Sequence, residues 1–363
     1  MKIAQVAPLY ESVPPKCYGG TERIVSYLTE ELVRQGHNVT LFASADSITS
    51  ARLVPCSETA LRLSPACRDP LAHHVRMMGK VHKAAAEFDI IHYHIDYLHF
   101  PLSRLSPTPN VTTLHGRLDL PELGPLYRDF SEMPVVSISE SQRGPIPWAN
   151  WSGTVYHGLP ENLYSFHEKP GGYLAFLGRI SPEKRVDRAI DVARRSGMKL
   201  KIAAKVDRVD QEYFEREIKP LLNDPLVEFI GEIGEDEKNE FLGNAYALLF
   251  PIDWPEPFGM VMIEAMACGT PVIAYRNGSV LEVMVDGLTG FIVENQEEAL
   301  QAVEKVSELS RGLCREVFER RYTSSRMASG YLNIYRSLCG REYKLLHPPV
   351  PKLVAKGSRM LLD

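Results

Sequence analysis

The chain has 363 residues, 44% of them hydrophobic and 24% charged, and a formal net charge of −5. This composition is ordinary for a globular protein, and a slightly acidic chain gives no support for nucleic-acid binding, which usually requires a basic face. No apolar run approaches the roughly 20 residues of a membrane span, and the six cysteines are scattered without a metal-binding spacing. The length favours two domains. We expect a cytoplasmic protein with reduced thiols, for which peripheral contact with the inner face of a membrane stays open.

Strand and helix signals alternate from the first residues, which predicts a parallel α/β sheet. The first half contains runs that are typical of buried strands, at 2–7, 39–43, 89–92, 111–114 and 134–139. Between the second and third of these runs, the segment 47–80 is rich in proline, serine and arginine. We expect it to be irregular and to lead into a helix near 72–88.

Two glycines, Gly19 and Gly20, stand between the first strand and the first helix. Glycines at this place let the backbone approach a ligand closely, and Thr21 is a candidate cap for the helix. The spacing is not G-x-G-x-x-G, so the dinucleotide fingerprint is absent. A purely structural turn is the alternative.

Histidines follow two strands of the first half. His92 and His94 form an H-x-H with Asp96 close by, and His115 ends the next strand before a glycine. A metal site is conceivable at the H-x-H, but we favour a polar acceptor cleft, because open α/β sheets bind ligands at the carboxyl ends of their strands. His115 is expected at the rim of that cleft.

The second half restarts as an α/β unit after a proline- and glycine-rich stretch at 159–172, which we expect to link two domains. Its first strand runs into a loop that carries Arg179 and Lys184, and Lys205 follows the second strand. A cationic loop between a strand and a helix suits a diphosphate, since arginine binds bidentately and lysine adds a point charge. A solvated basic helix start is the alternative.

The segment 255–271 predicts a short buried helix over 258–267, with glycine and proline as stop signals. Glu264 is a carboxylate among apolar residues of this helix, and Glu256 lies eight residues earlier in the preceding loop. A buried carboxylate is costly unless a partner compensates for it. The alternatives are an ion pair between Glu264 and an arginine, with Glu256 solvated, or two inward carboxylates at a binding site.

The start of the same helix is a candidate anion site. Phe258, Gly259 and Met260 would present backbone N–H groups there, and such groups favour a negative charge such as a phosphate.

The segment PEPFGMVMIEAMACGTPVIA holds Glu256 and Glu264 with seven residues between them. It resembles the E-x7-E motif of retaining glycosyltransferases of the GT-B fold, particularly family 4 (glycosyl transferases group 1). The later D-G-x-x-G follows in the order that this family shows, and the resemblance covers roughly residues 1–338.

The resemblance implies an α/β protein of two Rossmann-like domains that face each other across a cleft. Residues 1–160 would bind the acceptor and residues 161–320 the nucleotide sugar. A helix within 321–340 would cross back to the first domain, and residues 341–363 would form a loose tail.

The resemblance also implies roles for the candidate residues. Glu264 would hold the ribose hydroxyls, whereas Glu256 would contact the sugar and stabilise positive charge at its anomeric carbon. Arg179 and Lys184 would bind the diphosphate, and His115 would contact the donor sugar or shape the reaction centre.

The glycine loop of Gly19 and Gly20 would touch the donor phosphates or the acceptor, and the helix start at 258–260 would meet the diphosphate. Three positions depart from the family pattern, and one of them is Arg185, which stands where the family usually has glycine. Lys205 stands where the family tends to have a glycine turn, and we expect it to add one more charge for the donor. His157 stands where the family usually has asparagine, which leaves its role open.

These expectations describe a retaining glycosyltransferase that moves a hexosyl group from a nucleoside-diphosphate sugar, with a UDP-sugar favoured. No cofactor and no essential metal are expected, because the chain has no D-x-D motif. The acceptor could be a glycan, a lipid-linked sugar or a small metabolite. A sugar-nucleotide epimerase of the same fold and a catalytically inactive nucleotide-sugar-binding protein are the alternatives.

Overall fold

The computed structural model describes residues 1–16 and 19–340. The described chain divides into two compact units, the first formed by Met1–Pro160 together with residues 323–340, and the second by Glu161–Tyr322. Within the described residues no helix has the length and apolarity to cross a membrane. The described cysteines are all free thiols.

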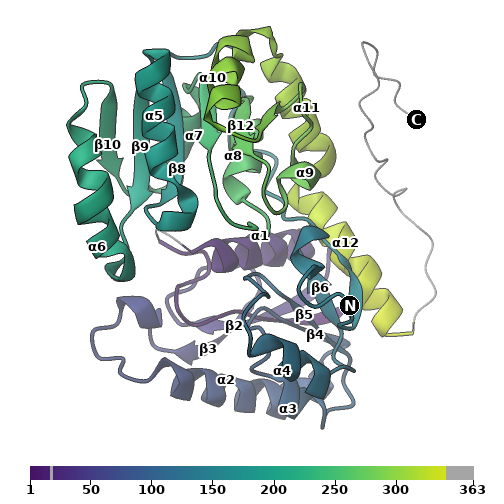
Figure 1. Ribbon diagram of the computed structural model, residues 1–363. Helices are drawn as coiled ribbons and strands as arrows, with labels where there is room; N and C mark the ends of the chain where they lie inside the picture. Colours follow the sequence, from purple (N-terminus) through teal and green to yellow (C-terminus); the bar gives the residue numbers. More distant parts are fainter. Residues whose placement is uncertain (17–18, 341–363) are drawn as a thin grey trace. The chain divides into compact units, whose positions relative to one another are not determined.

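The first unit is built on a parallel seven-stranded sheet with the order β3-β2-β1-β4-β5-β6-β7 (Figure 1). Strands β1, β4 and β5 lie inside it, and their fully buried residues explain the near-continuous apolar runs in the sequence. The strands are β1 (Lys2–Val6), β2 (Asn38–Ser44), β3 (Arg52–Ser57), β4 (Ile90–Tyr93), β5 (Asn110–Thr113), β6 (Val135–Ser137) and β7 (Trp151–Thr154).

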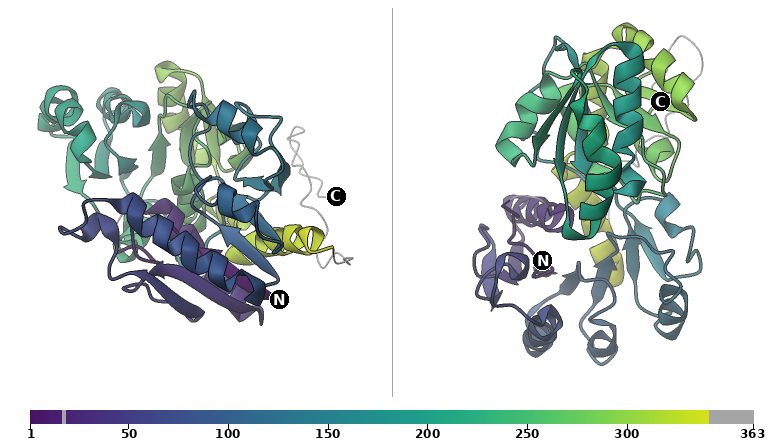
Figure 2. Two further views of the ribbon diagram at one scale, coloured as in Figure 1. Left: turned by 90° about the horizontal axis from the view of Figure 1, so that it is seen from below. Right: turned by 60° about the vertical axis from the view of Figure 1, so that its left-hand side comes forward.

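Helices cover both faces of this sheet. Helices α1 and α12 pack against each other on one face, and α2, α3 and α4 lie on the other (Figure 1 and, from below, Figure 2). Their bounds are α1 (Gly20–Arg34), α2 (Pro70–Ala84), α3 (Phe100–Ser103), α4 (Leu123–Asp129) and α12 (Ser324–Leu338).

The second unit has a parallel six-stranded sheet with the order β10-β9-β8-β11-β12-β13. Its strands are β8 (Tyr173–Arg179), β9 (Lys199–Lys205), β10 (Val227–Gly231), β11 (Ala247–Phe250), β12 (Val272–Tyr275) and β13 (Gly290–Val293). Its helices are α5 (Val186–Ser196), α6 (Gln211–Tyr213), α7 (Glu235–Gly243), α8 (Met260–Cys268), α9 (Val280–Val283), α10 (Gln296–Lys305) and α11 (Arg311–Arg321).

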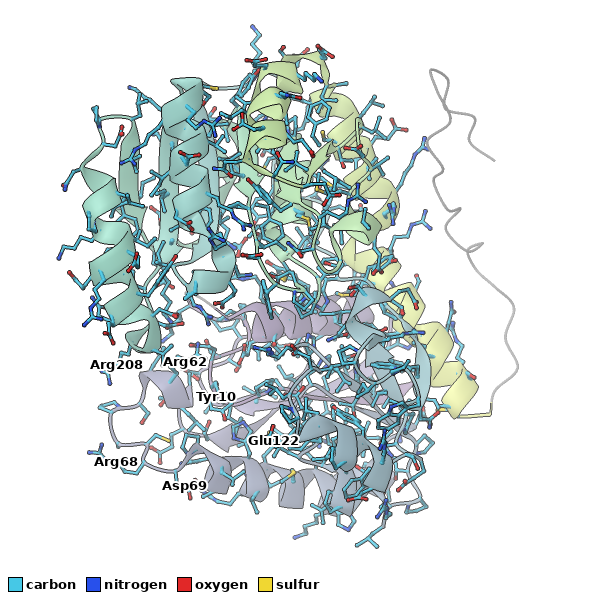
Figure 3. The ribbon with its side chains drawn as sticks, in the orientation of Figure 1. Tyr10, Arg62, Arg68, Asp69, Glu122 and Arg208 are labelled. Atoms are coloured by element: carbon cyan, nitrogen blue, oxygen red, sulfur yellow. The ribbon has the colours of Figure 1, made fainter. Side chains whose placement is uncertain are left out.

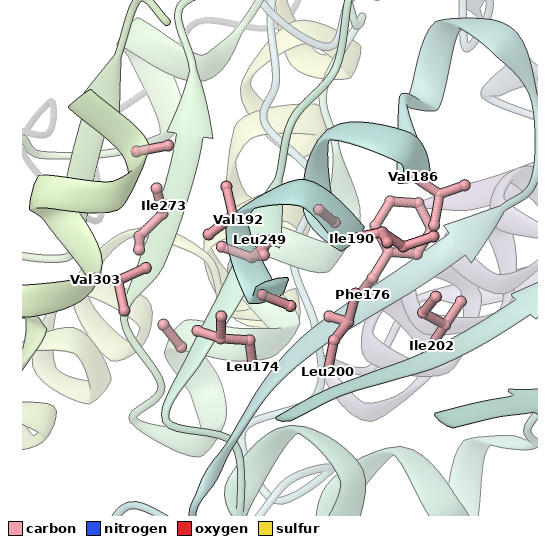
Figure 4. Close-up of a cluster of buried hydrophobic side chains, with 14 of the residues drawn as sticks. Leu174, Phe176, Val186, Ile190, Val192, Leu200, Ile202, Leu249, Ile273 and Val303 are labelled. Atoms are coloured by element: carbon pink, nitrogen blue, oxygen red, sulfur yellow. The ribbon is translucent and has the colours of Figure 1, made fainter. Parts of the chain in front are cut away.

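The core of the second unit lies between its sheet and the pair α5 and α10. Figure 4 shows part of this cluster, in which Val186 and Ile190 of α5 meet Phe176 of β8 and Ile202 of β9. Helix α8 packs with α7 and α11 instead. It is apolar around its whole circumference and buried from Met262 to Cys268, as the sequence predicted.

The structure corrects three predictions about secondary structure. Strand β3 lies in the segment expected to be irregular; it pairs only with β2, and such an edge position tolerates its Pro55. Strand β7 was also missed. The stretch 315–338 reads as one helix in the sequence, but the structure divides it between α11 (Arg311–Arg321) and α12, because Thr323 accepts a hydrogen bond from the Arg326 N–H and so caps a new helix. The tail expected over 341–363 lies outside the described residues.

Candidate functional site

The loop from β11 to α8 places Glu256 beside the start of a helix. Gly259 precedes α8 with φ +77°, a left-handed conformation that favours glycine, and a Cβ there would lie 2.8 Å from the Met262 side chain. The helix begins at Met260 and not at Phe258 as predicted. The Phe258 side chain is buried and packs on Tyr322, so its side chain belongs to the core and only its backbone can serve the anion site.

Glu256 and Lys184 form an ion pair, although 72 residues separate them in the chain. The Trp254 indole donates a second hydrogen bond to the Glu256 carboxylate at 2.9 Å. The Lys184 ammonium lies over the rings of Phe250 and Trp254, at 5.7 and 5.3 Å from their centroids. The predicted sugar-binding carboxylate and the predicted phosphate-binding lysine therefore share one place, and neither is a freely solvated loop residue.

A second loop holds the Glu256 backbone from the other side, and sequence reasoning gave it no role. The Ser279 N–H donates to the Glu256 carbonyl at 3.0 Å, and its hydroxyl donates to the Phe258 carbonyl at 2.8 Å. Gly278 has φ +54°, and a Cβ there would stand 2.4 Å from the Glu256 backbone. The Asn-Gly of this N-G-S sequence was the available signal, since that dipeptide marks a tight turn.

Glu264 is buried and paired. Its side chain is 2% exposed, and the Lys238 ammonium of α7 lies 2.8 Å from it. The Tyr164 hydroxyl lies 3.4 Å from the same oxygen, and Glu235 is the second carboxylate near Lys238, at 3.6 Å. The sequence alternative of an arginine partner is wrong, because the compensating cation is a lysine. The pair leaves one Glu264 oxygen, Oε2, without a hydrogen bond of its own in the described contacts.

Arg179 and Lys205 stand side by side at the carboxyl ends of β8 and β9, where they are register partners. Three carboxylates surround Arg179: Glu183 at 2.6 Å, Asp210 at 3.3 Å and Asp207 at 3.8 Å. Asp207 also binds Lys205 at 3.0 Å. Two neighbouring cations would repel each other, and these acids offset that repulsion while fixing both side chains. Sequence reasoning missed the acids, although V-D-R-V-D directly follows the strand.

The two glycines of the first unit have different surroundings. A Cβ on Gly19 would lie 2.8 Å from Pro15, whereas a Cβ on Gly20 would meet no atom within 4 Å. Gly19 is therefore required by packing, and Gly20 opens α1 beside free space. The prediction that Thr21 caps this helix is wrong, because the cap residue is Gly19 and Thr21 lies within the first turn.

His115 belongs to a chain of buried hydrogen bonds. Its Nε2 lies 2.8 Å from Nδ1 of His94, and Nε2 of His94 lies 2.8 Å from the amide oxygen of Gln5. The Gln5 amide nitrogen donates to the hydroxyl of Tyr335 in α12. The His157 ring stacks on His115 with centroids 5.3 Å apart.

The direction of this chain assigns the protons. Because the Gln5 oxygen can only accept, Nε2 of His94 carries its proton, and Nδ1 of His94 is an acceptor. Nε2 of His115 must then be the donor, which leaves Nδ1 of His115 as a lone-pair acceptor. That atom is buried without a hydrogen-bond partner in the described part of the chain. It is suited to accept a hydrogen bond from a ligand hydroxyl.

His92 does not line a cleft as predicted. It is fully buried, with Nδ1 2.6 Å from the Tyr335 hydroxyl and Nε2 2.7 Å from Thr113 Oγ1. Both ring nitrogens of His94 are also engaged, so neither imidazole of the H-x-H is available to a metal. Among residues 1–16 and 19–340, no group of three or more histidine, cysteine or acidic side chains is placed to hold a metal ion.

Burial sets the charge state of these imidazoles. Desolvation lowers the pKa of His115 to about 3 and holds the pKa of His92, His94 and His157 well below the usual value. All four rings are therefore neutral at pH 7. Burial also raises the pKa of Asp96, which follows the H-x-H, to about 6.

Comparison with known families and proteins bears on this arrangement. Residues 165–320 match the sequence profile described as "Glycosyl transferases group 1", and residues 18–142 match that of "Glycosyltransferase Family 4". An uncharacterized glycosyltransferase of Methanocaldococcus jannaschii is 24% identical, over 93% of this chain and 98% of its own. The phosphatidyl-myo-inositol mannosyltransferase of Mycobacterium leprae is 26% identical, over 93% of this chain and 97% of its own.

Solved structures of glycosyltransferases share the fold. AviGT4, from avilamycin A biosynthesis, superposes with a TM-score of 0.70 at 22% identity, over 94% of this chain and 98% of its own. HepE of Anabaena, solved with UDP-glucose, superposes with a TM-score of 0.70 at 18% identity, over 94% of this chain and all of its own. With two parallel-sheet units and both family profiles matched, this chain belongs to the family 4, or group 1, glycosyltransferases of the GT-B fold.

Proposed function

We propose that this enzyme is a retaining, metal-independent glycosyltransferase that uses a UDP-sugar as its donor. The observation that carries the proposal is the contact between Glu256 and Lys184 at the N-terminus of α8. It joins a carboxylate, which can stabilise positive charge at an anomeric carbon, to a cation, which can stabilise negative charge on a departing phosphate. The solved structure of HepE with UDP-glucose supports the choice of base.

The proposed donor contacts follow from the geometry of the second unit. Glu264 would accept hydrogen bonds from the ribose hydroxyls through the oxygen that Lys238 does not occupy. Arg179, Lys184 and Lys205 would face the diphosphate together with the backbone N–H groups at Gly259 and Met260. His115, on the first unit, would accept a hydrogen bond from a hydroxyl of the reacting sugar at Nδ1.

In the reaction, the bond between the anomeric carbon and the β-phosphate oxygen breaks. A bond from the acceptor oxygen to the same carbon forms on the same face, and the acceptor proton passes to the departing phosphate. The neutral Nδ1 of His115 fixes the sugar without adding a positive charge next to a carbon that is itself becoming positive. We do not assign Glu256 as a covalent nucleophile.

Glu256→Gln tests the proposal, because it keeps the shape of the side chain and the Trp254 contact but removes the charge. We expect transfer and donor hydrolysis to fall at least about 100-fold. UDP should still bind, and more tightly than to the wild type, because Lys184 loses the carboxylate that competes for it. UDP binding is measured by the shift of the melting midpoint with EDTA present, and about 2–3 kcal/mol is expected at saturating ligand. Full activity of Glu256→Gln would remove the residue from the site, and the absence of a midpoint shift with UDP, GDP or ADP would contradict the transferase itself.

A further inference from the structure

A cavity lies in the first unit, away from the histidine chain and unused by the proposed chemistry. It has a volume of about 460 Å³, which is within the range of small-molecule sites. It opens where β3 ends and is closed on one side by α2. Its lining comes from Ala45, Pro55–Thr59, Leu61, Ser64, Ala66, Cys67, His73, Arg76 and Lys80.

The helix wall of this cavity is basic. His73, Arg76 and Lys80 recur at intervals of three and four residues, so they share one face of α2. Arg76 and Lys80 form no ion pair with an acidic side chain within the described residues. Lys80 is instead anchored to the Pro55 carbonyl at 2.5 Å. Glu58 is the acidic residue in the lining, so the wall carries a positive excess.

Two polar atoms at the cavity have no partner. The Ser57 hydroxyl, on a residue that is 9% exposed, and Nδ1 of His73 are both buried without a hydrogen bond in the part of the chain that the structure describes. Buried polar atoms without partners are uncommon and call for a ligand or water. Burial raises the pKa of the Cys56 thiol, which also lines the cavity, to about 11. The positive charges of Lys80 and Arg76 oppose this rise, so they act on the interior of the cavity.

The position of the cavity defines its relation to the reaction. It lies at the carboxyl end of β3, on the edge of the sheet at which His115 follows β5. The order β3-β2-β1-β4-β5 places four strand spacings between them, or about 19 Å. A ligand group in the cavity is therefore too far from His115 to react there, but both places lie at the end of the sheet where such folds bind ligands.

We propose that this cavity binds a phosphate group of the acceptor, at a distance of about 19 Å from the hydroxyl that reacts. Arg76 and Lys80 supply charge, and Ser57 with His73 supplies hydrogen bonds to the phosphate oxygens. The inference rests on the proposed transferase function, because it names a part of that enzyme's acceptor. It implies an extended acceptor, either a phosphorylated oligosaccharide or the headgroup of a phosphate-bearing lipid.

Figure 3 labels three further charged residues on this part of the chain, Arg68 and Asp69 just before α2 and Arg62 in the short turn 61–63. Arg62 is engaged by Glu11 at 2.9 Å. Arg62 is therefore less available to a phosphate than Arg76, and only Arg76 and Lys80 of the helix wall are chosen for substitution.

The test titrates the full chain with inorganic phosphate and with glycerol 3-phosphate, following the imidazole resonances of His73 by NMR. We expect saturable shifts in the wild type and at least about tenfold weaker binding in the double variant Arg76→Gln/Lys80→Gln. The matched control is Lys83→Gln, which removes a charge from the same helix outside the cavity and should bind as the wild type does. No saturable shift with either probe overturns the proposal, as does equal weakening by Lys83→Gln.

A second arm separates the two sources of phosphate. Vesicles of phosphatidylglycerol are compared with vesicles of phosphatidylcholine in a sedimentation assay. The phosphate belongs to a lipid if phosphatidylglycerol binding is lost in Arg76→Gln/Lys80→Gln but kept in Lys83→Gln. It belongs to a soluble acceptor if glycerol 3-phosphate binds saturably and vesicles do not bind. The UDP-induced midpoint shift is measured on the same samples. It should be unchanged in all variants, so that failure of the cavity and failure of the transferase assignment give different results.

Discussion

Because the first unit contains buried imidazoles, we expect acid to lower its stability before it lowers the stability of the second unit. Five histidines have a pKa that burial lowers strongly: His92, His94, His99, His115 and His157. Their folded pKa lies below the unfolded value of about 6.5, so the unfolded chain binds more protons. Stability is therefore fully present above about pH 6.5 and is lost as the pH falls toward the folded pKa.

The size of the effect can be worked from His115, whose pKa is about 3. Lowering the pH from 7.5 to 5.5 should cost between about 1 and 2 kcal/mol for this one ring. His92, His94, His99 and His157 act in the same direction. Asp96, with a pKa raised to about 6, acts in the opposite sense, because it becomes protonated in the folded unit at acid pH, and it returns about 1 kcal/mol. Because five rings act against this one carboxyl, the first unit should lose stability as the pH falls.

Urea unfolding at pH 7.5 and 5.5 measures this loss. Trp148 and Trp151 lie in the first unit and Trp254 in the second, so fluorescence of the variant Trp254→Phe reports on the first unit alone. We expect a marked fall of the urea midpoint at pH 5.5. His99→Gln should reduce the pH dependence by about one proton, whereas His82→Gln, at an exposed position of α2, should not change it. A midpoint that is the same at both pH values would refute the reasoning.

Three further predictions concern the second unit. Lys238→Met leaves buried Glu264 without its cation and should destabilise the unit by about 3–5 kcal/mol. Glu264→Gln should destabilise it less, because Lys238 then keeps Glu235 as a partner. Thermal unfolding of the two variants compares them. Arg311→Met should cost about 3–5 kcal/mol, since it leaves three backbone carbonyls without the donor that now satisfies them. A lowered melting midpoint with normal UDP affinity would show this. Asp210→Asn removes a negative charge 3.3 Å from Arg179 and should tighten UDP binding a few-fold in calorimetry; weaker binding would mean that Asp210 serves mainly to position Arg179.

The sequence predicted the fold well where strands are buried on both faces. Strands β1, β4 and β5 were found within one or two residues, because a buried parallel strand reads as a near-continuous apolar run. The missed strands, β3 and β7, lie at the two edges of the first sheet. One contains Pro55 and the other Gly153, residues that a period-based analysis treats as breaks but that an edge position tolerates.

At the site, motif spacing predicted which residues are buried or charged better than it predicted which side chains they contact. Glu264 was expected to be buried, and it is, but its cation is Lys238, which lies on another helix and carries no motif. The chain from Gln5 through His94 to His115 could not be predicted either. It is completed by Tyr335, which is 330 residues from Gln5 in the sequence, and only the packing of α12 on the first sheet brings the two together.

The largest gap between sequence and structure is electrostatic. Arg179, Lys184 and Lys205 suggested a strongly basic loop, but each of them already holds a carboxylate. Such pairing keeps long, flexible side chains in one geometry, so that little conformational entropy remains to be lost when a diphosphate binds. It also weakens the field at the site, and a donor must compete with Asp207 and Glu256 for the same cations. We infer that donor binding in this enzyme depends more on the fixed positions of these cations than on their net charge. The N-terminus of α8, which no carboxylate of the described residues caps, then becomes a more important source of positive potential than the paired cations.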